Sequence, residues 1–88
     1  MAQIILGTED DDALIAAVHE ALRALGGRKV KAWWGVGGSQ EVAHEKWRIG
    51  WRTVVLEGET YVGLSLTGSQ RLTARIADLA DHYLSGES

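Results

Sequence analysis

Hydrophobic side chains recur along this chain at two different spacings, and the order of the two spacings limits the folds open to it. Near the amino terminus, apolar residues lie three or four positions apart, which is typical of a helix with one buried face (Leu14, Ile15, Val18, Leu22 and Leu25). Thr8 and the acids after it favour a helix start, and Gly26 and Gly27 favour an end. We therefore predict a helix over residues 9–25.

The same helical spacing returns near the carboxyl terminus. Thr67 and Gln70 stand three positions apart, as in a capping box, and would begin a second helix. An apolar stripe follows them at helical spacing (Leu72, Ile76, Leu79, Ala80 and Tyr83). Residues 85–88 are expected to form a frayed tail.

Between the two helices, apolar residues lie two positions apart, which is typical of strands with one buried face. Residues 2–6, which precede the first helix, are expected to form a first short strand, and residues 29–36, between the helices, a second. Residues 43–56 read as one long third strand, with Gly50 as a candidate bulge that would exchange its faces, and residues 61–66 as a fourth. Turns are expected at residues 37–39 and 57–58, where glycines cluster.

This order, β-α-β-β-β-α, predicts an α+β fold in two layers. Both amphipathic helices would cover one face of a four-stranded, mainly antiparallel sheet. A right-handed crossover would run the first strand parallel to the second. The 88 residues are enough for one domain, which we assign to residues 1–88.

Strand pairing follows from the expected turns. The pairs Trp51–Leu64, Thr53–Val62, Val30–Trp47 and Trp34–Ala43 would lie on the helix side. The reverse face would then pair Lys31 with Lys46 and Lys29 with Arg48, although like charges directly opposite each other destabilise a sheet. Glu45 falls on the apolar side in this register, an unusual position for a carboxylate.

The four tryptophans fall within residues 33–51, together with much of the positive charge. Residues 28–52 carry a net charge of +4, whereas the rest of the chain carries −7 and the whole −3. The alternation predicts that Trp34, Trp47 and Trp51 serve the core and that Trp33 faces outward. The candidate binding residues on the outward face are cationic or aromatic (Lys29, Lys31, Trp33, His44, Lys46, Arg48, Arg52 and Tyr61).

Three interpretations of this face are compatible with the sequence. The first is an interface with an acidic protein surface or with a second copy of the chain, since Trp, Tyr and Arg are common at interface hot spots. The second is binding of single-stranded DNA or RNA, because aromatics stack on bases and cations follow phosphates. The third is a solvated strand surface whose lysines discourage edge pairing. We expect the first.

No motif in the sequence predicts catalysis, a cofactor or a metal. The glycines at residues 35–38 are followed by a strand and lack the helix that a phosphate-binding loop needs. The acids at residues 10–12 lack the spacing of a calcium loop, and Asp78 with His82 has no third ligand. We therefore expect a non-catalytic protein with no cofactor.

Composition adds the expected compartment. There is no cysteine, so thiolate chemistry and cysteine-based zinc sites are excluded. The amino terminus lacks the basic segment of a secretory signal, and no apolar run approaches the length of a membrane span. We expect a cytoplasmic protein with no membrane partner.

Overall fold

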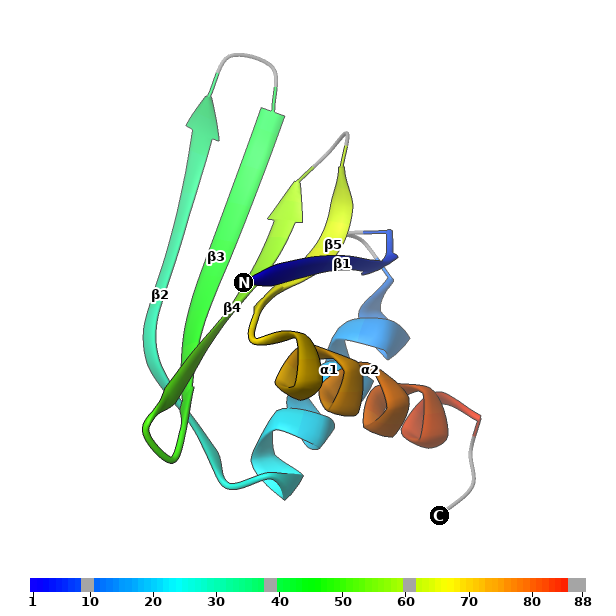
Figure 1. Ribbon diagram of the computed structural model, residues 1–88. Coiled ribbons are helices and arrows are strands. Elements are labelled where there is room, and N and C mark those ends of the chain that lie inside the picture. Colours follow the sequence, from blue (N-terminus) through cyan, green and yellow to red (C-terminus); the bar gives the residue numbers. More distant parts are fainter. Residues whose placement is uncertain (9–10, 38–39, 60–61, 86–88) are drawn as a thin grey trace.

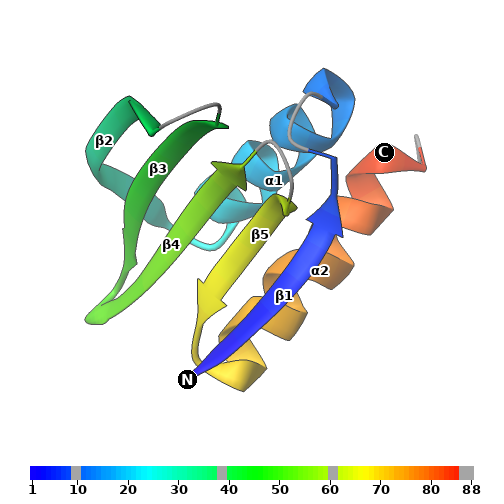
Figure 2. The ribbon, with the colours of Figure 1, turned by 90° about the horizontal axis from the view of Figure 1, so that it is seen from above.

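A computed structural model describes residues 1–8, 11–37, 40–59 and 62–85 of the chain. It shows an α+β fold in which two helices lie on one face of a five-stranded antiparallel sheet (Figures 1 and 2). The predicted class is therefore confirmed, but the sheet has five strands where four were expected. The elements follow in the order β1 (Ala2–Gly7), α1 (Asp12–Ala24), β2 (Gly27–Gly37), β3 (Gln40–Ile49), β4 (Arg52–Glu59), β5 (Gly63–Gly68) and α2 (Gln70–Leu84).

The additional strand arises from a tight turn at Gly50. Ile49 pairs with Arg52, so Gly50 and Trp51 form a two-residue hairpin loop between β3 and β4. Gly50 has a φ of +62°, and a positive φ at the first loop residue alone is the pattern of a type II′ turn. The single long strand expected over residues 43–56 is therefore wrong.

This turn changes which side chains face the helices. Trp51 was expected in the core, but it sits at the hairpin tip and is 83% exposed. Its expected pairing with Leu64 is wrong, as is that of Thr53 with Val62. In the structure Leu56 pairs with Leu66, and Gly58 with Leu64, so residues 57–58 lie inside β4 instead of forming a turn.

The strand order is β1-β5-β4-β3-β2, and every neighbouring pair is antiparallel. Strands β1 and β2 therefore run in the same direction, as the crossover argument predicts, but they form opposite edges of the sheet. Because β1 pairs with β5, α1 carries the chain from one edge to the other. The β2 edge is longer, with 11 residues against 6 in β1.

The helix ends differ by a few residues from those expected. Helix α1 is capped by Asp11, whose Oδ1 accepts a hydrogen bond from the Leu14 amide at 3.1 Å, in place of Thr8. Helix α2 is capped by Ser69, whose hydroxyl accepts from the Leu72 amide at 3.2 Å, so the Thr67 capping box is wrong. In both cases a side-chain oxygen satisfies an amide that has no partner within the helix.

The core lies between the two helices and the inner part of the sheet. Helix α1 buries five side chains and α2 buries four. Among the sheet side chains whose burial the structure describes, Trp47 is the largest buried one and is only 3% exposed. The strands contribute mainly from β4 and β5 (Val54, Leu56, Leu64 and Leu66). Tyr83, expected on the apolar stripe of α2, is instead exposed. The side chain of Trp34 and the turn at residues 38–39 lie outside the described part of the chain.

Trp47 is buried and Trp51 is exposed, so substitutions of the two provide a test of this arrangement. Trp47→Ala should lower the free energy of unfolding by about 3–5 kcal/mol, because it empties a large core site. Trp51→Ala should change it by less than about 0.5 kcal/mol, because its side chain is exposed. Urea unfolding followed by circular dichroism measures both. A cost for Trp51→Ala as large as that for Trp47→Ala would contradict the turn at Gly50.

Candidate functional site

The hairpin of β2 and β3 is the part of the sheet that extends beyond the rest (Figure 1). Its strands have 11 and 10 residues, the longest in the protein. The helices bury Trp47 near its base, whereas Val30, Ala32 and Ala43 on the hairpin are exposed. We use "open sheet face" for the face of the sheet that points away from the helices. On the hairpin this face carries Arg28, Lys31, Trp33, His44, Lys46 and Arg48.

A bulge in β2 decides which cations reach the open sheet face. The register shifts between Lys29 and Lys31, so Val30 has no partner on β3. Lys29 therefore pairs with Trp47 and lies on the helix side, which makes its assignment to the outward face wrong. Arg28 takes its place, directly opposite Arg48. The expected pair Val30–Trp47 is wrong for the same reason.

The pairings beyond the bulge agree with those predicted. Lys31 pairs with Lys46, and Trp34 pairs with Ala43. Two like-charged pairs thus lie side by side on the open sheet face, and we call these four residues the basic patch (Arg28, Arg48, Lys31 and Lys46). All four are exposed. On β4, Thr53 pairs with Arg48 and Val55 pairs with Lys46. Each like-charged pair therefore continues across the sheet, in a row of paired residues, to a side chain that is not a carboxylate.

An aromatic pair lies beside the basic patch. The rings of Trp33 and His44 stack across the two strands with centroids 4.7 Å apart and planes 5° apart. The Lys31 ammonium lies over the Trp33 ring, 5.4 Å from its centroid. His44 Nδ1 lies 3.8 Å from a carboxylate oxygen of Glu57 on β4. This row of contacts holds the Trp33 ring against the sheet while leaving it 43% exposed.

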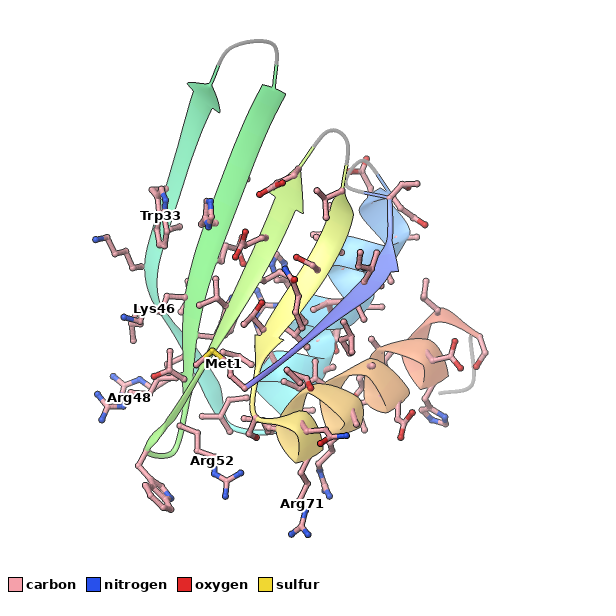
Figure 3. The ribbon with its side chains drawn as sticks, turned by 45° about the horizontal axis from the view of Figure 1, so that its top comes forward. Met1, Trp33, Lys46, Arg48, Arg52 and Arg71 are labelled. Atoms are coloured by element: carbon pink, nitrogen blue, oxygen red, sulfur yellow. The ribbon has the colours of Figure 1, made fainter. Side chains whose placement is uncertain are left out.

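Arg52 occupies a different place from the one predicted. It begins β4, pairs with Ile49, and its guanidinium donates to the Ser69 hydroxyl at the cap of α2, at 3.4 Å. It also lies 5.7 Å from the ring centroid of Trp51. Figure 3 shows Arg52 and Arg71 at the bottom of the view, below Arg48, which projects to the side. Tyr61 lies outside the described residues. Of the eight candidate residues, the structure brings five together on the open sheet face (Lys31, Trp33, His44, Lys46 and Arg48).

The helix side of the hairpin holds a polar cluster around Glu45. Its Oε1 accepts hydrogen bonds from His19 Nε2 on α1 at 2.8 Å and from Trp47 Nε1 at 2.9 Å. Lys29 Nζ lies 4.0 Å from the other carboxylate oxygen. Partial burial by itself raises the pKa of Glu45, but the hydrogen bonds from Trp47 and His19 and the charges of His19 and Lys29 together outweigh it. The pKa therefore lies below its usual value. The predicted position of Glu45 on the apolar side is confirmed, and these partners explain how it is tolerated.

Sequence reasoning missed two members of this region. Arg28 was missed because Val30 fits a regular strand as well as a bulge, and only the bulge turns Arg28 outward. The link between His19 and Glu45 joins residues 26 positions apart, so it depends on how α1 crosses the sheet. The spacing of His19 on α1 carried no signal by itself.

The structure offers no metal centre among the residues it describes, since no three His, Cys, Asp or Glu side chains of this set come together. Over the same residues, no helix has the length and hydrophobicity needed to cross a membrane. Comparison of the chain with protein-family models, with curated proteins and with solved structures gave no match.

The Glu45 cluster predicts a specific dependence of stability on pH. Because the folded state lowers the pKa of Glu45, its ionised form adds stability above the unfolded value of 4.5. That contribution is lost as the pH falls through the folded value. Glu45→Gln should cost about 1 kcal/mol at neutral pH, the difference between charged and neutral hydrogen bonds, and progressively less in acid.

Urea unfolding of wild type and Glu45→Gln between neutral pH and pH values below the usual glutamate range would measure this difference. Glu20→Gln is the matched control, because Glu20 is an exposed carboxylate on the same helix as His19. It should change the free energy of unfolding by less than about 0.5 kcal/mol. A constant offset between Glu45→Gln and wild type at every pH would contradict the assigned role of the Glu45 charge.

The basic patch predicts that one charge reversal stabilises the protein. In Lys46→Glu, the directly opposed pair with Lys31 becomes an attractive one, so the free energy of unfolding should rise by about 0.2–1 kcal/mol. The gain should shrink in concentrated salt, because exposed charges are screened. Thermal and urea unfolding at low and high salt would measure it. Destabilisation by Lys46→Glu at low salt would show that the two lysines do not repel each other as their pairing implies.

Proposed function

We propose that this protein is a non-catalytic binding module that uses its open sheet face to contact an acidic surface of another protein. The observation that carries the proposal is the basic patch, in which Arg28–Arg48 and Lys31–Lys46 are paired with like charge. Such pairs lower the stability of a sheet, and an acidic partner would remove the repulsion on binding.

The surroundings of the basic patch favour a protein partner. The open sheet face also carries two aliphatic side chains, half-buried Val55 beside Lys46 and Ile5 at the far edge, which is 61% exposed. The other side chains of this face on β4, β5 and β1 are polar (Thr53, Glu57, Ser65, Thr67 and Gln3). A mixture of cations, an exposed tryptophan and aliphatic side chains resembles a protein interface more than a phosphate-binding groove. Basic and apolar areas on one face match a partner that has acids around an apolar centre.

Trp33 bears on the nucleic-acid alternative. A base would need a free face of the indole ring for stacking. In this structure His44 is stacked on one face of that ring, and the Lys31 ammonium also lies over it. Trp33 is therefore better suited to an edge contact within a protein interface. Binding of single-stranded DNA or RNA by the same face is the second hypothesis, and the experiment below separates the two.

A second copy of the chain is one protein that could supply the acids. Helix α2 exposes Asp78 and Asp81, which lie on the other layer of the molecule from the basic patch. A contact between the open sheet face of one copy and α2 of another would join different surfaces and would not close as a dimer. Light scattering over a range of protein concentrations would reveal it as a mass that grows with concentration.

Two charge-matched probes would test the proposal directly. The first is an acidic peptide with leucines interspersed among glutamates, and the second is a single-stranded oligonucleotide with the same number of negative charges. We expect quenching or a shift of tryptophan fluorescence with the peptide, and weaker binding of the oligonucleotide. Lys46→Glu should reduce peptide affinity by about tenfold or more, because it reverses a charge at the contact.

Arg75→Glu is the matched control, since it makes the same charge change on an exposed residue of α2. Its effect should stay below about threefold at physiological salt, where distant charges are screened. Tighter binding of the oligonucleotide than of the peptide would favour the nucleic-acid hypothesis. Equal effects of Lys46→Glu and Arg75→Glu would show that the open sheet face is not the binding surface.

A further inference from the structure

A hollow lies at the base of the hairpin, at the Arg28–Arg48 end of the basic patch. It has a volume of about 530 Å³ and is lined by Gly26, Arg28, Val30, Arg48 and Gly50. This volume falls within the roughly 300–1,000 Å³ typical of small-ligand sites. Two of its five lining residues carry permanent positive charge, and Val30, which is 55% exposed, supplies an apolar wall.

Local backbone structure builds this hollow. The bulge at Val30 turns Arg28 to the open sheet face, where it pairs with Arg48. Gly26 and Gly50 have φ values of +80° and +62°, so both positions favour glycine, and a Cβ at either would meet nothing within 4 Å. The two turns therefore border the hollow without side chains that would fill it.

The two guanidiniums have no acidic partner within the described part of the chain. None of the ion pairs formed by those residues involves Arg28 or Arg48. The next residue along their row is Thr53 on β4, whose hydroxyl is uncharged. Two neighbouring guanidiniums that have no partner among these residues, at the edge of a hollow, have the charge and the donors to bind an anion with several oxygens.

The two guanidiniums, with their two positive charges and several N–H donors, favour one kind of anion over others. One guanidinium satisfies both oxygens of a carboxylate, so a single carboxylate would leave the second arginine without a counter-charge. A phosphodiester carries one negative charge and would also leave a net positive charge. A phosphomonoester carries close to two negative charges at neutral pH and has three terminal oxygens, which match two guanidiniums.

We propose that the Arg28–Arg48 hollow binds the phosphoryl group of a phosphorylated side chain on the partner protein. Val30 would contact the carbon atoms of that side chain, and the basic patch would contact the acids around it. This inference rests on the proposed function, because it takes the partner to be a protein, and it specifies the group that anchors that partner.

The test compares two forms of one acidic peptide, with phosphoserine or with glutamate at its central position. Isothermal titration calorimetry should show that wild type prefers the phosphorylated form by about tenfold or more, as expected for additional charged hydrogen bonds. Arg48→Gln and Arg28→Gln should bring this preference close to one. Arg48→Lys should retain only part of it, because an ammonium lacks the planar fork of the guanidinium.

Lys46→Gln is the matched control, since it removes one cation of the same basic patch outside the lining of the hollow. It should weaken both peptides equally and leave the preference unchanged. Inorganic phosphate should compete with the phosphorylated peptide more strongly than with the glutamate form.

The outcomes separate this inference from the proposed function. Equal affinity of wild type for the two peptides, with both weakened by Lys46→Gln, would overturn the phosphate site and leave the acidic-partner proposal standing. No binding of either peptide would overturn both. A preference for the phosphorylated form that Arg48→Gln and Arg28→Gln leave intact would show that the phosphate binds elsewhere. Circular dichroism would confirm that each variant is folded.

Discussion

Burial of Trp47 against the helices decides which way the long hairpin faces. Side chains alternate along a strand, so once Trp47 points inward, Lys46 and Arg48 must point outward. The indole nitrogen also donates to Glu45, which accepts a second hydrogen bond from His19 on α1. One aromatic side chain thus links α1 to the hairpin and sets the outward direction of Lys46 and Arg48, while the bulge at Val30 sets that of Arg28 and Lys31.

Much of this architecture could be predicted from periodicity. The errors in strand pairing come from two backbone irregularities, the turn at Gly50 and the bulge at Val30, and the remaining errors concern the helix caps and Tyr83. The helices, the inward position of Trp47 and the opposition of Lys31 and Lys46 follow from apolar spacing. The turn at Gly50 was missed because Val54 and Val55 are both apolar. A strand with either of these two side chains facing the helices would be acceptable, so the alternation did not reveal the turn. Only the three-dimensional pairing shows that the strand reverses at Gly50 and leaves Trp51 outside the core.

The two faces of the hairpin differ in whether their charged side chains have partners of opposite charge. On the helix side, Glu45 has hydrogen-bond donors and a nearby cation, and no buried side-chain polar atom of the described residues lacks a partner. On the open face, four cations are exposed without a carboxylate in their rows. A domain of 88 residues has a small margin of stability, so repulsion retained on one face is a cost that the proposed binding role would explain.

The bulge at Val30 has a consequence for how the protein behaves among other chains. Strand β2 is a long edge with 11 residues, and a regular edge of this length is a template for continued sheet growth and aggregation. Val30 interrupts the regular backbone pattern, and Lys29 and Lys31 place charge on both sides of the interruption. The irregularity that brings Arg28 to Arg48 therefore also protects the edge, so the hairpin can present side chains to a partner without offering its backbone to a stray strand.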